Sequence, residues 1–255
     1  LYAKGHMYKT FNSNLLFHGC IPMKENGEFD KIEVIGKSLK GKELLDHLEN
    51  VAHKAYLGDK TEENQEAVDF MWYLWCGPKS PLFGKEKAAT FERYFIDDKE
   101  THKENKNSYY TLINKEEICN KILENFEQNI EEGHIINGHV PVKAKDGESP
   151  VKAGGKLIVI DGGFAKAYQS TTGIAGYTLT YNSHGLVLAM NEPFESKNKA
   201  ILDGSDIKSQ TILKENILTR KRVADTDIGE KLKEEIQDLK QLLVAYREGV
   251  LKESV

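Results

Sequence analysis

The 255-residue sequence lacks most features that mark secreted, membrane-spanning or nucleic-acid-binding proteins. Its three cysteines are far apart, and it contains neither a Cys-x-x-Cys pair nor an Asn-x-Ser/Thr acceptor, which disfavours a disulfide framework and a thiolate zinc site. No apolar run approaches the roughly 18 to 20 residues that cross a bilayer, and the N-terminus shows no secretory signal pattern. The net charge of -5 gives no global attraction for nucleic acid or anionic membrane. We therefore expect a cytoplasmic globular protein that has neither nucleic acid nor a membrane as a partner.

The composition is otherwise that of a protein with a substantial core. Hydrophobic residues make up 39% of the chain, and 255 residues suffice for one large domain or two modest ones. The sequence opens at Leu1 and enters a strand-like pattern almost at once, so we interpret it as part of a longer protein.

Apolar patterning predicts an α/β fold. Short apolar or alternating runs bounded by turn residues predict strands at residues 7–11, 14–17, 32–35, 135–136, 156–160, 177–181, 186–190 and 217–223. Apolar residues at helical spacing predict helices at residues 42–56, 62–75, 115–129 and 229–252. Thr61 and Asn114 are the predicted N-caps of the second and third helices. From this order we expect a sheet region formed by residues 1–36 and 133–228, a mainly helical insertion at residues 37–132, and a C-terminal helix at residues 229–255.

Two histidines stand where apolar runs give way to Gly or Pro. His18 follows the run at residues 14–17, and His139 follows Ile135 and Ile136. Side chains just past buried strands gather at the carboxyl edge of a sheet, where α/β proteins keep their ligands. Imidazole suits zinc, manganese or iron, so the pair is a candidate for half a metal site. The alternative is that both are polar core histidines that satisfy their own hydrogen bonds.

Other polar residues are weaker candidates for ligand contacts. Lys79 and Lys85 lie in a Gly/Pro-stiffened loop at residues 77–85 and could bind a sugar phosphate, or could be ordinary surface lysines. Asp161 follows the strand at residues 156–160 and could contact metal-bound water or a substrate hydroxyl, although such residues usually satisfy their own backbone. The lysines that follow glycine do not complete a P-loop, so an ATP site is not indicated.

The histidine elements resemble a known family. His-Gly-x-x-Pro at residues 18–22 and Asn-Gly-His-x-Pro at residues 137–141 resemble the last two metal-ligand blocks of calcineurin-like metallophosphoesterases. The longer strings at residues 14–22, 75–85, 155–169 and 218–223 are similar to those of the class III fructose-1,6-bisphosphatases of Firmicutes, and the resemblance covers nearly the whole chain. It implies the C-terminal half of a metallophosphoesterase-like β-sandwich flanked by helices, with a helical insertion.

The resemblance also implies a function and a division of labour. The expected reaction is manganese-dependent hydrolysis of a sugar bisphosphate, fructose 1,6-bisphosphate, in gluconeogenesis. His18 and His139 would bind the second of two metals, and Lys166 and Tyr168 would border the substrate. The family's Asp-x-His block, bridging Asp and Asn-His block, with the general acid, would precede Leu1. We therefore assign no catalytic residue within this chain and expect the isolated chain to be inactive.

Two alternatives remain open at the sequence level. The chain could come from a protein phosphatase or a dinucleotide-polyphosphate phosphatase on the same scaffold, which would need an open groove. It could also be a folded, non-catalytic fragment that binds an anion or takes part in assembly. Cutting a sheet should leave an unpaired edge and an apolar face, so we expect a homo-oligomer or association with the missing N-terminal half.

Overall fold

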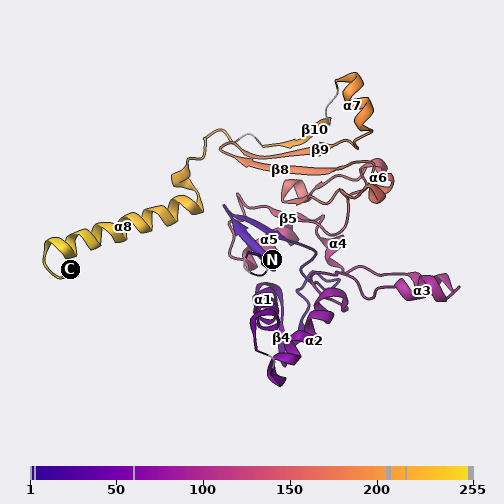
Figure 1. Ribbon diagram of the computed structural model, residues 1–255, viewed down its shortest axis with the longest axis horizontal. Helices are drawn as coiled ribbons and strands as arrows, with labels where there is room; N and C mark the ends of the chain where they lie inside the picture. Colours follow the sequence, from indigo (N-terminus) through magenta and orange to yellow (C-terminus); the bar gives the residue numbers. More distant parts are fainter. Residues whose placement is uncertain (1, 3, 60, 205–207, 216, 252–255) are drawn as a thin grey trace. The chain divides into compact units, whose positions relative to one another are not determined.

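The computed structural model describes residues 2, 4–59, 61–204, 208–215 and 217–251 (Figure 1). The chain divides into two compact units. The first comprises Leu1–Thr178 with Met190–Gln210, and the second comprises Leu179–Ala189 with Thr211–Val255. None of the helices in the described ranges is both long enough and apolar enough to cross a bilayer.

The first unit combines helices with a mixed sheet, which confirms the α/β class. The strands of the chain are β1 (Tyr8–Phe11), β2 (Asn14–Phe17), β3 (Ile32–Val34), β4 (Lys37–Leu39), β5 (Ile135–Asn137), β6 (Val151–Lys152), β7 (Leu157–Val159), β8 (Gly176–Asn182), β9 (Gly185–Asn191) and β10 (Ser209–Lys214). The helices are α1 (Gly41–Leu57), α2 (Glu62–Cys76), α3 (Thr90–Phe95), α4 (Tyr109–Leu112), α5 (Glu116–Asn125), α6 (Lys166–Thr172), α7 (Lys197–Asp203) and α8 (Asp227–Arg247).

A five-stranded mixed sheet organises the first unit. Its strand order is β1-β2-β5-β7-β6, in which β2, β5 and β7 run parallel and the two outer strands run antiparallel to their neighbours. The register places Leu15 beside Ile135 and Ile135 beside Leu157, and all three side chains are fully buried. Parallel strands end at one edge of a sheet, so the residues that follow β2, β5 and β7 are brought together.

Helices from the segment between β2 and β5 supply the rest of this core. The apolar stripe of α1 is buried, as is that of α5, because each repeats at the 3.6-residue period of a helix that covers a core on one side. The buried members are Leu44, Leu45, Leu48, Val51, Ile118, Ile122 and Leu123. The N-terminus of α2 is capped by Thr61, whose hydroxyl accepts a hydrogen bond from the Asn64 amide at 3.3 Å, as predicted.

Two sequence predictions are wrong in detail. Helix α5 is capped by Lys115, because the Asn114 side chain donates to the Thr111 carbonyl at 3.1 Å and so belongs to the preceding turn. The helix ends at Asn125 and does not reach residue 129, because Glu127 adopts a left-handed φ of 59°.

A third prediction, a strand at residues 217–223, is also wrong. In its described part, the Ile217 amide donates to His184 and the Lys221 amide donates to Ser183, so the segment contacts the turn of the β8–β9 hairpin without forming a ladder. The third strand of the three-stranded sheet, whose order is β10-β9-β8, is instead β10. The C-terminal helix α8 covers most of its predicted range, and the predicted end at Lys252 lies outside the described residues.

Removing a core side chain of β2 should destabilise the unit that positions His18. Leu15→Ala deletes a fully buried side chain, and we expect a loss of about 2 to 5 kcal/mol in the free energy of unfolding. Leu57→Ala makes the same chemical change at a side chain that is 72% exposed, so it should cost less than about 0.5 kcal/mol. Urea unfolding followed by circular dichroism measures both. Equal midpoints for the two variants would contradict the assigned core.

Candidate functional site

The carboxyl ends of β2 and β5 bring two histidines into direct contact. His18 follows β2 and His139 follows β5, and His18 Nε2 lies 3.0 Å from His139 Nδ1. The ring centroids are 4.8 Å apart and the ring planes are inclined by 66°, so the two nitrogens face each other edge to edge. The convergence follows from strand order, because β2 and β5 are adjacent and parallel.

A backbone carbonyl fixes which nitrogen of His139 carries a proton. His139 Nε2 lies 2.8 Å from the carbonyl oxygen of Phe83. A carbonyl can only accept a hydrogen bond, so Nε2 is the donor and the lone pair of the neutral ring is on Nδ1, which faces His18. Histidines that bind metals usually donate their other ring N–H to a carbonyl or a carboxylate in this way. The arrangement therefore orients His139 as a ligand through Nδ1.

The backbone at His139 is strained, and neighbouring hydrogen bonds hold it. His139 has a left-handed φ of 69°, which is uncommon for a residue other than glycine. The Gly138 amide donates to the His18 carbonyl at 3.0 Å, and the Val140 amide donates to the Gly138 carbonyl at 2.9 Å. Strain of this kind persists where the surroundings determine the conformation, and it is concentrated at functional sites.

The electrostatic setting keeps His18 neutral. Partial desolvation of the ring lowers the pKa of His18 below its usual value, and repulsion from a positive charge on His139 lowers it further. Asp161 acts in the opposite direction but is the smallest of the three influences. A neutral imidazole has a free lone pair for a metal, so the pair is suited to bind a divalent cation near neutral pH.

Asp161 lies at the same sheet edge, just beyond β7. A Cβ placed on Gly138 would be 3.6 Å from the Asp161 Cβ, so the two loops are in contact. Asp161 Oδ1 accepts a hydrogen bond from the Gly163 amide at 3.0 Å, and its carbonyl accepts one from the Val142 amide at 2.9 Å. The carboxylate therefore supports its own turn, the expected structural role, while its charge also acts on His18.

The loop at residues 77–85 closes over the first histidine element. Gly19 leaves no room for a side chain, since a Cβ there would lie 2.4 Å from the Pro81 carbonyl oxygen. The Cys20 amide donates to that same carbonyl at 2.9 Å, and the buried Ser80 hydroxyl donates to the Leu74 carbonyl. This anchoring holds the Phe83 carbonyl against His139. The loop therefore contributes to the site through its backbone, which sequence reasoning about its lysines did not anticipate.

The lysines of that loop are each paired with a carboxylate. Lys79 Nζ lies 2.8 Å from Asp30, and Lys85 Nζ lies 2.7 Å from Glu104. Within the described residues, these ion pairs do not connect either ammonium group to His18 or His139.

Lys166 and Tyr168 lie on the exposed helix α6, which follows the glycines after Asp161. A Cβ built on Gly163 would come within 2.7 Å of the Tyr168 Cβ, so Tyr168 lies against the turn that Asp161 supports. The side chain of Tyr168 is 56% exposed, which leaves it accessible to a ligand.

A small basic cavity next to His139 was not predicted from the sequence. It has a volume of about 80 Å³ and is lined in part by Asn137, Gly138, Lys106, Glu148 and Lys152. Asn137 Nδ2 donates to Gly19 and to the Tyr109 hydroxyl, while its buried Oδ1 has no hydrogen-bond partner in the structure. In the sequence, the signal that could have pointed to this cavity was Asn137, in the Asn-Gly-His string at residues 137–139. Lys106 and Lys152 come from segments without a recognisable motif.

Burial lowers the pKa of Lys106, and the neighbouring Lys85 lowers it further, whereas Glu148 opposes the shift. A lysine whose charge is incompletely compensated and that lines a cavity is suited to bind an anionic group.

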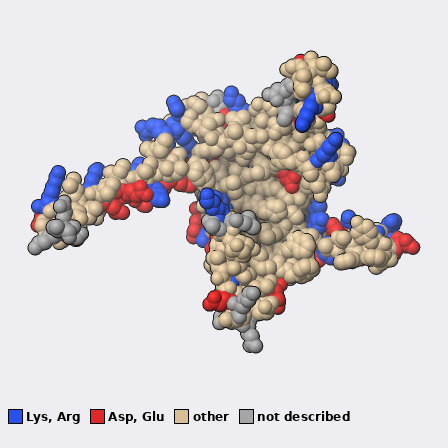
Figure 2. Space-filling view, in the orientation of Figure 1, with Lys and Arg blue, Asp and Glu red and all other residues tan. Residues whose placement is uncertain are grey.

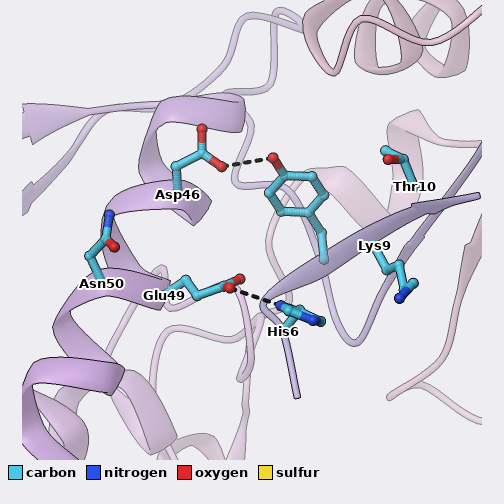
Figure 3. Close-up of a pocket in the computed structure, with 7 residues that line it drawn as sticks. His6, Lys9, Thr10, Asp46, Glu49 and Asn50 are labelled. Carbon is cyan, nitrogen blue, oxygen red and sulfur yellow. Dashed lines mark hydrogen bonds and ion pairs between the residues drawn. The ribbon is translucent and has the colours of Figure 1, made fainter. Parts of the chain in front are cut away.

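Two larger hollows lie along β1. One, of about 370 Å³, reaches from Lys9 across Leu16 to His18 and Gly138 on one face of the sheet. The other, of about 500 Å³, lies between β1 and α1, and Figure 3 shows Asp46 and Glu49 of α1 joined by dashed lines to residues on the strand side. There the Tyr8 hydroxyl donates to Asp46 at 2.7 Å, and His6 Nδ1 lies 2.9 Å from Glu49. These pairs satisfy each other, so the second hollow provides no convergent ligand set.

The described part of the chain contains no cluster of three or more His, Cys, Asp or Glu side chains that could hold a metal ion. Within the described residues the histidine pair therefore offers two ligands to a metal ion. A pair of imidazoles leaves most coordination positions of a divalent cation to other ligands.

The lowered pKa of His18 predicts a measurable titration. In metal-free protein the His18 ring should titrate below the usual histidine value of about 6.5. The unfolded chain then binds a proton at His18 more readily than the folded chain does. The contribution of neutral His18 to the free energy of unfolding is therefore fully present above about pH 6.5, and it is lost as the pH falls below that value. NMR of the imidazole resonances, assigned with His18→Asn, measures the midpoint. A midpoint at or above 6.5 would contradict the electrostatic account.

Comparison with known proteins places the chain in a family. Residues 1–248 match the family described as Firmicute fructose-1,6-bisphosphatase. The chain is similar to "Fructose-1,6-bisphosphatase class 3" of Clostridium botulinum (strain Loch Maree / Type A3), with 58% identity over 99% of this chain and 38% of the relative. It is also 58% identical to the class 3 protein of Clostridium tetani (strain Massachusetts / E88), over 100% of this chain and 39% of the relative. No solved structure matches.

The chain thus spans about two fifths of the length of the curated relatives that it matches. The family match extends through both histidine elements, the loop at residues 77–85 and the whole of α8. These observations show that the chain belongs to the Firmicute, class 3, fructose-1,6-bisphosphatase family.

Proposed function

We propose that the protein to which this chain belongs hydrolyses fructose 1,6-bisphosphate to fructose 6-phosphate and phosphate, a step of gluconeogenesis. The observation that carries the proposal is the contact between His18 and His139 in a chain that matches this family over residues 1–248. In this reaction the oxygen of a water molecule forms a bond to the phosphorus of the C1 phosphate group. The bond between that phosphorus and the oxygen on C1 of the sugar breaks. That oxygen takes up a proton as the sugar leaves.

The geometry of the histidine pair fits a divalent metal. A histidine nitrogen lies about 2.1 Å from the divalent ion that it binds. If two such nitrogens bind one ion with an N–metal–N angle of about 90°, they are about 3 Å apart. The observed separation of His18 Nε2 and His139 Nδ1 is 3.0 Å. The Phe83 carbonyl already takes the other N–H of His139, so no rotation of that ring is needed. Transfer of the His18 proton from Nε2 to Nδ1 would leave one lone pair on each of the two facing nitrogens for the ion.

We propose manganese as the metal, in a dinuclear site whose other ligands come from outside this chain. Such a site orients a phosphate, offsets its charge and lowers the pKa of a bound water. Within this chain, His18 and His139 would hold one ion, and Asp161 would keep negative charge close to it. The chain by itself would then be inactive, because two imidazoles cannot supply these functions alone.

The basic cavity beside Gly138 is the best-supported substrate contact within the chain. Lys106 offers an ammonium donor to a phosphate oxygen, and Lys152, which also pairs with Glu148 at 2.8 Å, lines the same cavity. Lys166 and Tyr168 remain proposed contacts because their helix follows Asp161 directly. Lys79 and Lys85 are weaker proposals, since both are paired with carboxylates.

The wider setting is proposed on the same basis. Residues 1–36 and 133–228 would form the C-terminal half of a metallophosphoesterase-like β-sandwich, residues 37–132 a helical insertion, and residues 229–255 a separate helical segment. The full protein would act in the cytoplasm on a soluble sugar bisphosphate. The part of the protein described by this chain would associate with the N-terminal half, with a second copy, or with both.

Removal of one histidine should abolish most of the activity. For the full-length protein assayed with manganese, His139→Ala should lower phosphate release from fructose 1,6-bisphosphate by about 100-fold or more, because an oriented metal ligand is lost. His184→Ala is the control, since that histidine lies in the β8–β9 turn and its ring contacts the Ile217 carbonyl. Manganese affinity, measured by calorimetry, should fall in the first variant alone. Unchanged activity of His139→Ala would return this residue to a structural role.

Loss of a cavity lysine should affect substrate binding more than turnover. Lys106→Met in the full-length protein should raise KM for fructose 1,6-bisphosphate by about 10- to 100-fold, the usual weight of a charged hydrogen bond, with a smaller change in kcat. Lys103→Met removes an equal charge at an exposed pair with Glu100 and should leave both constants near the wild-type values. A KM that responds equally to the two substitutions would indicate a general charge effect and no specific contact.

A further inference from the structure

We propose that α8 (Asp227–Arg247) pairs with α8 of a second copy of this chain to form a parallel, two-stranded coiled coil. The inference does not depend on the proposed reaction. It rests on the spacing, exposure and charge of residues in this one helix.

Five large apolar residues of α8 follow a heptad repeat, and Ile228, Leu242 and Val244 lie outside it. The spacing of the five alternates between four and three residues over Leu232, Ile236, Leu239, Leu243 and Tyr246. A stripe with this spacing packs against a globular core or against a second helix, and its exposure in the described part of the chain is the reason for assigning it to a second helix. We call these five residues the seam. In heptad notation, Ile236 and Leu243 occupy a positions, and the other three occupy d positions.

The whole seam is exposed within the described part of the chain. The exposed fractions of its side chains run from 44% for Leu232 to 64% for Leu239. The buried residue of α8 is Gly229, which lies against the backbone of Val223 at the start of the helix. The helix is closed at its N-terminus by Thr226, whose hydroxyl accepts from the Gly229 amide at 3.2 Å. A cap and a few charge pairs give a 21-residue helix only marginal stability, so a partner for the seam is needed.

The charges beside the seam identify a parallel second copy as the partner. The e positions are all basic, namely Lys233, Lys240 and Arg247, and Glu235 is the charged member of the g positions, the others being Ile228 and Leu242. In a parallel pair, g of one helix faces e of the next heptad on the other, so Glu235 faces Lys240 of the second copy and attracts it. In an antiparallel pair, e positions face each other, and basic residues would repel. Figure 2 shows charged residues of both signs along this helix.

The seam composition favours two strands. Ile236, which is β-branched, and Leu243 lie at a positions, while Leu232, Leu239 and Tyr246 lie at d positions. β-Branched residues at a together with leucine at d are the combination that favours parallel dimers over trimers or tetramers. One interface of this kind would join two copies of the protein through their C-terminal segments.

The first test measures the mass of the full protein by light scattering. Ile236→Lys with Leu239→Lys places two charges in the seam, and we expect the mass to fall by half. The matched control, Gln237→Lys with Gln241→Lys, adds the same charge on the outer face of α8 and should keep the wild-type mass. A seam variant that retains the wild-type mass would overturn the proposal.

The second test uses disulfide trapping, which reports the direction of the two helices in the pair. Leu232→Cys should form a disulfide between two copies, because identical seam residues face each other in a parallel pair. Wild type is the control, since Cys20 and Cys119 are buried and Cys76 is half-buried. Trapping only when Leu232→Cys is mixed with Tyr246→Cys would show an antiparallel pair. No trapping would show that α8 binds its own chain or another protein. Either result overturns the proposal.

A charge exchange tests the partner assignment directly. Lys240→Glu should weaken the pairing at least 10-fold, because Glu235 of each copy then faces a glutamate. Adding Glu235→Lys should restore the wild-type affinity, since the facing charges are again opposite. Failure of the double variant to recover, with the single variant weakened, would contradict the parallel register.

Discussion

The candidate site depends on the parallel arrangement of β2, β5 and β7. Each of these short strands is buried by packing that involves Leu15, Ile135 and Leu157, and each ends at the same edge. The residues that follow the strands are therefore close to one another, although His18 and His139 are 121 positions apart in sequence. The contact of 3.0 Å between His18 and His139 is a direct consequence of this strand pairing. A shift in the register of β2 against β5 would separate the two nitrogens.

The helical segment between the strands has a second function besides covering the core. It returns the loop at residues 77–85 to the first histidine element, where Gly19 and Cys20 contact the Pro81 carbonyl. The Phe83 carbonyl then fixes the proton of His139 on Nε2. The stability of the loop and the coordinating ability of His139 are thus coupled, because a displaced carbonyl would free the ring to rotate or to change tautomer.

Much of this arrangement could be predicted from sequence because its signals are local. Apolar runs ending in Gly or Pro located His18 and His139, and a helical repeat located α1, α2 and α8. What could not be predicted depends on contacts between distant segments. The Phe83 carbonyl, the pairing of Lys79 with Asp30 and the cavity around Lys106 have no local pattern. The strand expected at residues 217–223 failed for a similar reason, since β-branched residues there meet only a turn. The roles of the candidate site residues stay predictions.

The central claim is that His18 and His139 together bind one divalent metal, His139 through Nδ1. A crystal structure of the full-length protein grown with manganese, with data collected at a wavelength where manganese scatters anomalously, tests it most directly. The account predicts an anomalous peak about 2 Å from both His18 Nε2 and His139 Nδ1, with Nε2 of His139 still bonded to the Phe83 carbonyl. A peak that contacts neither ring, or a His139 ring bound through Nε2, would contradict it.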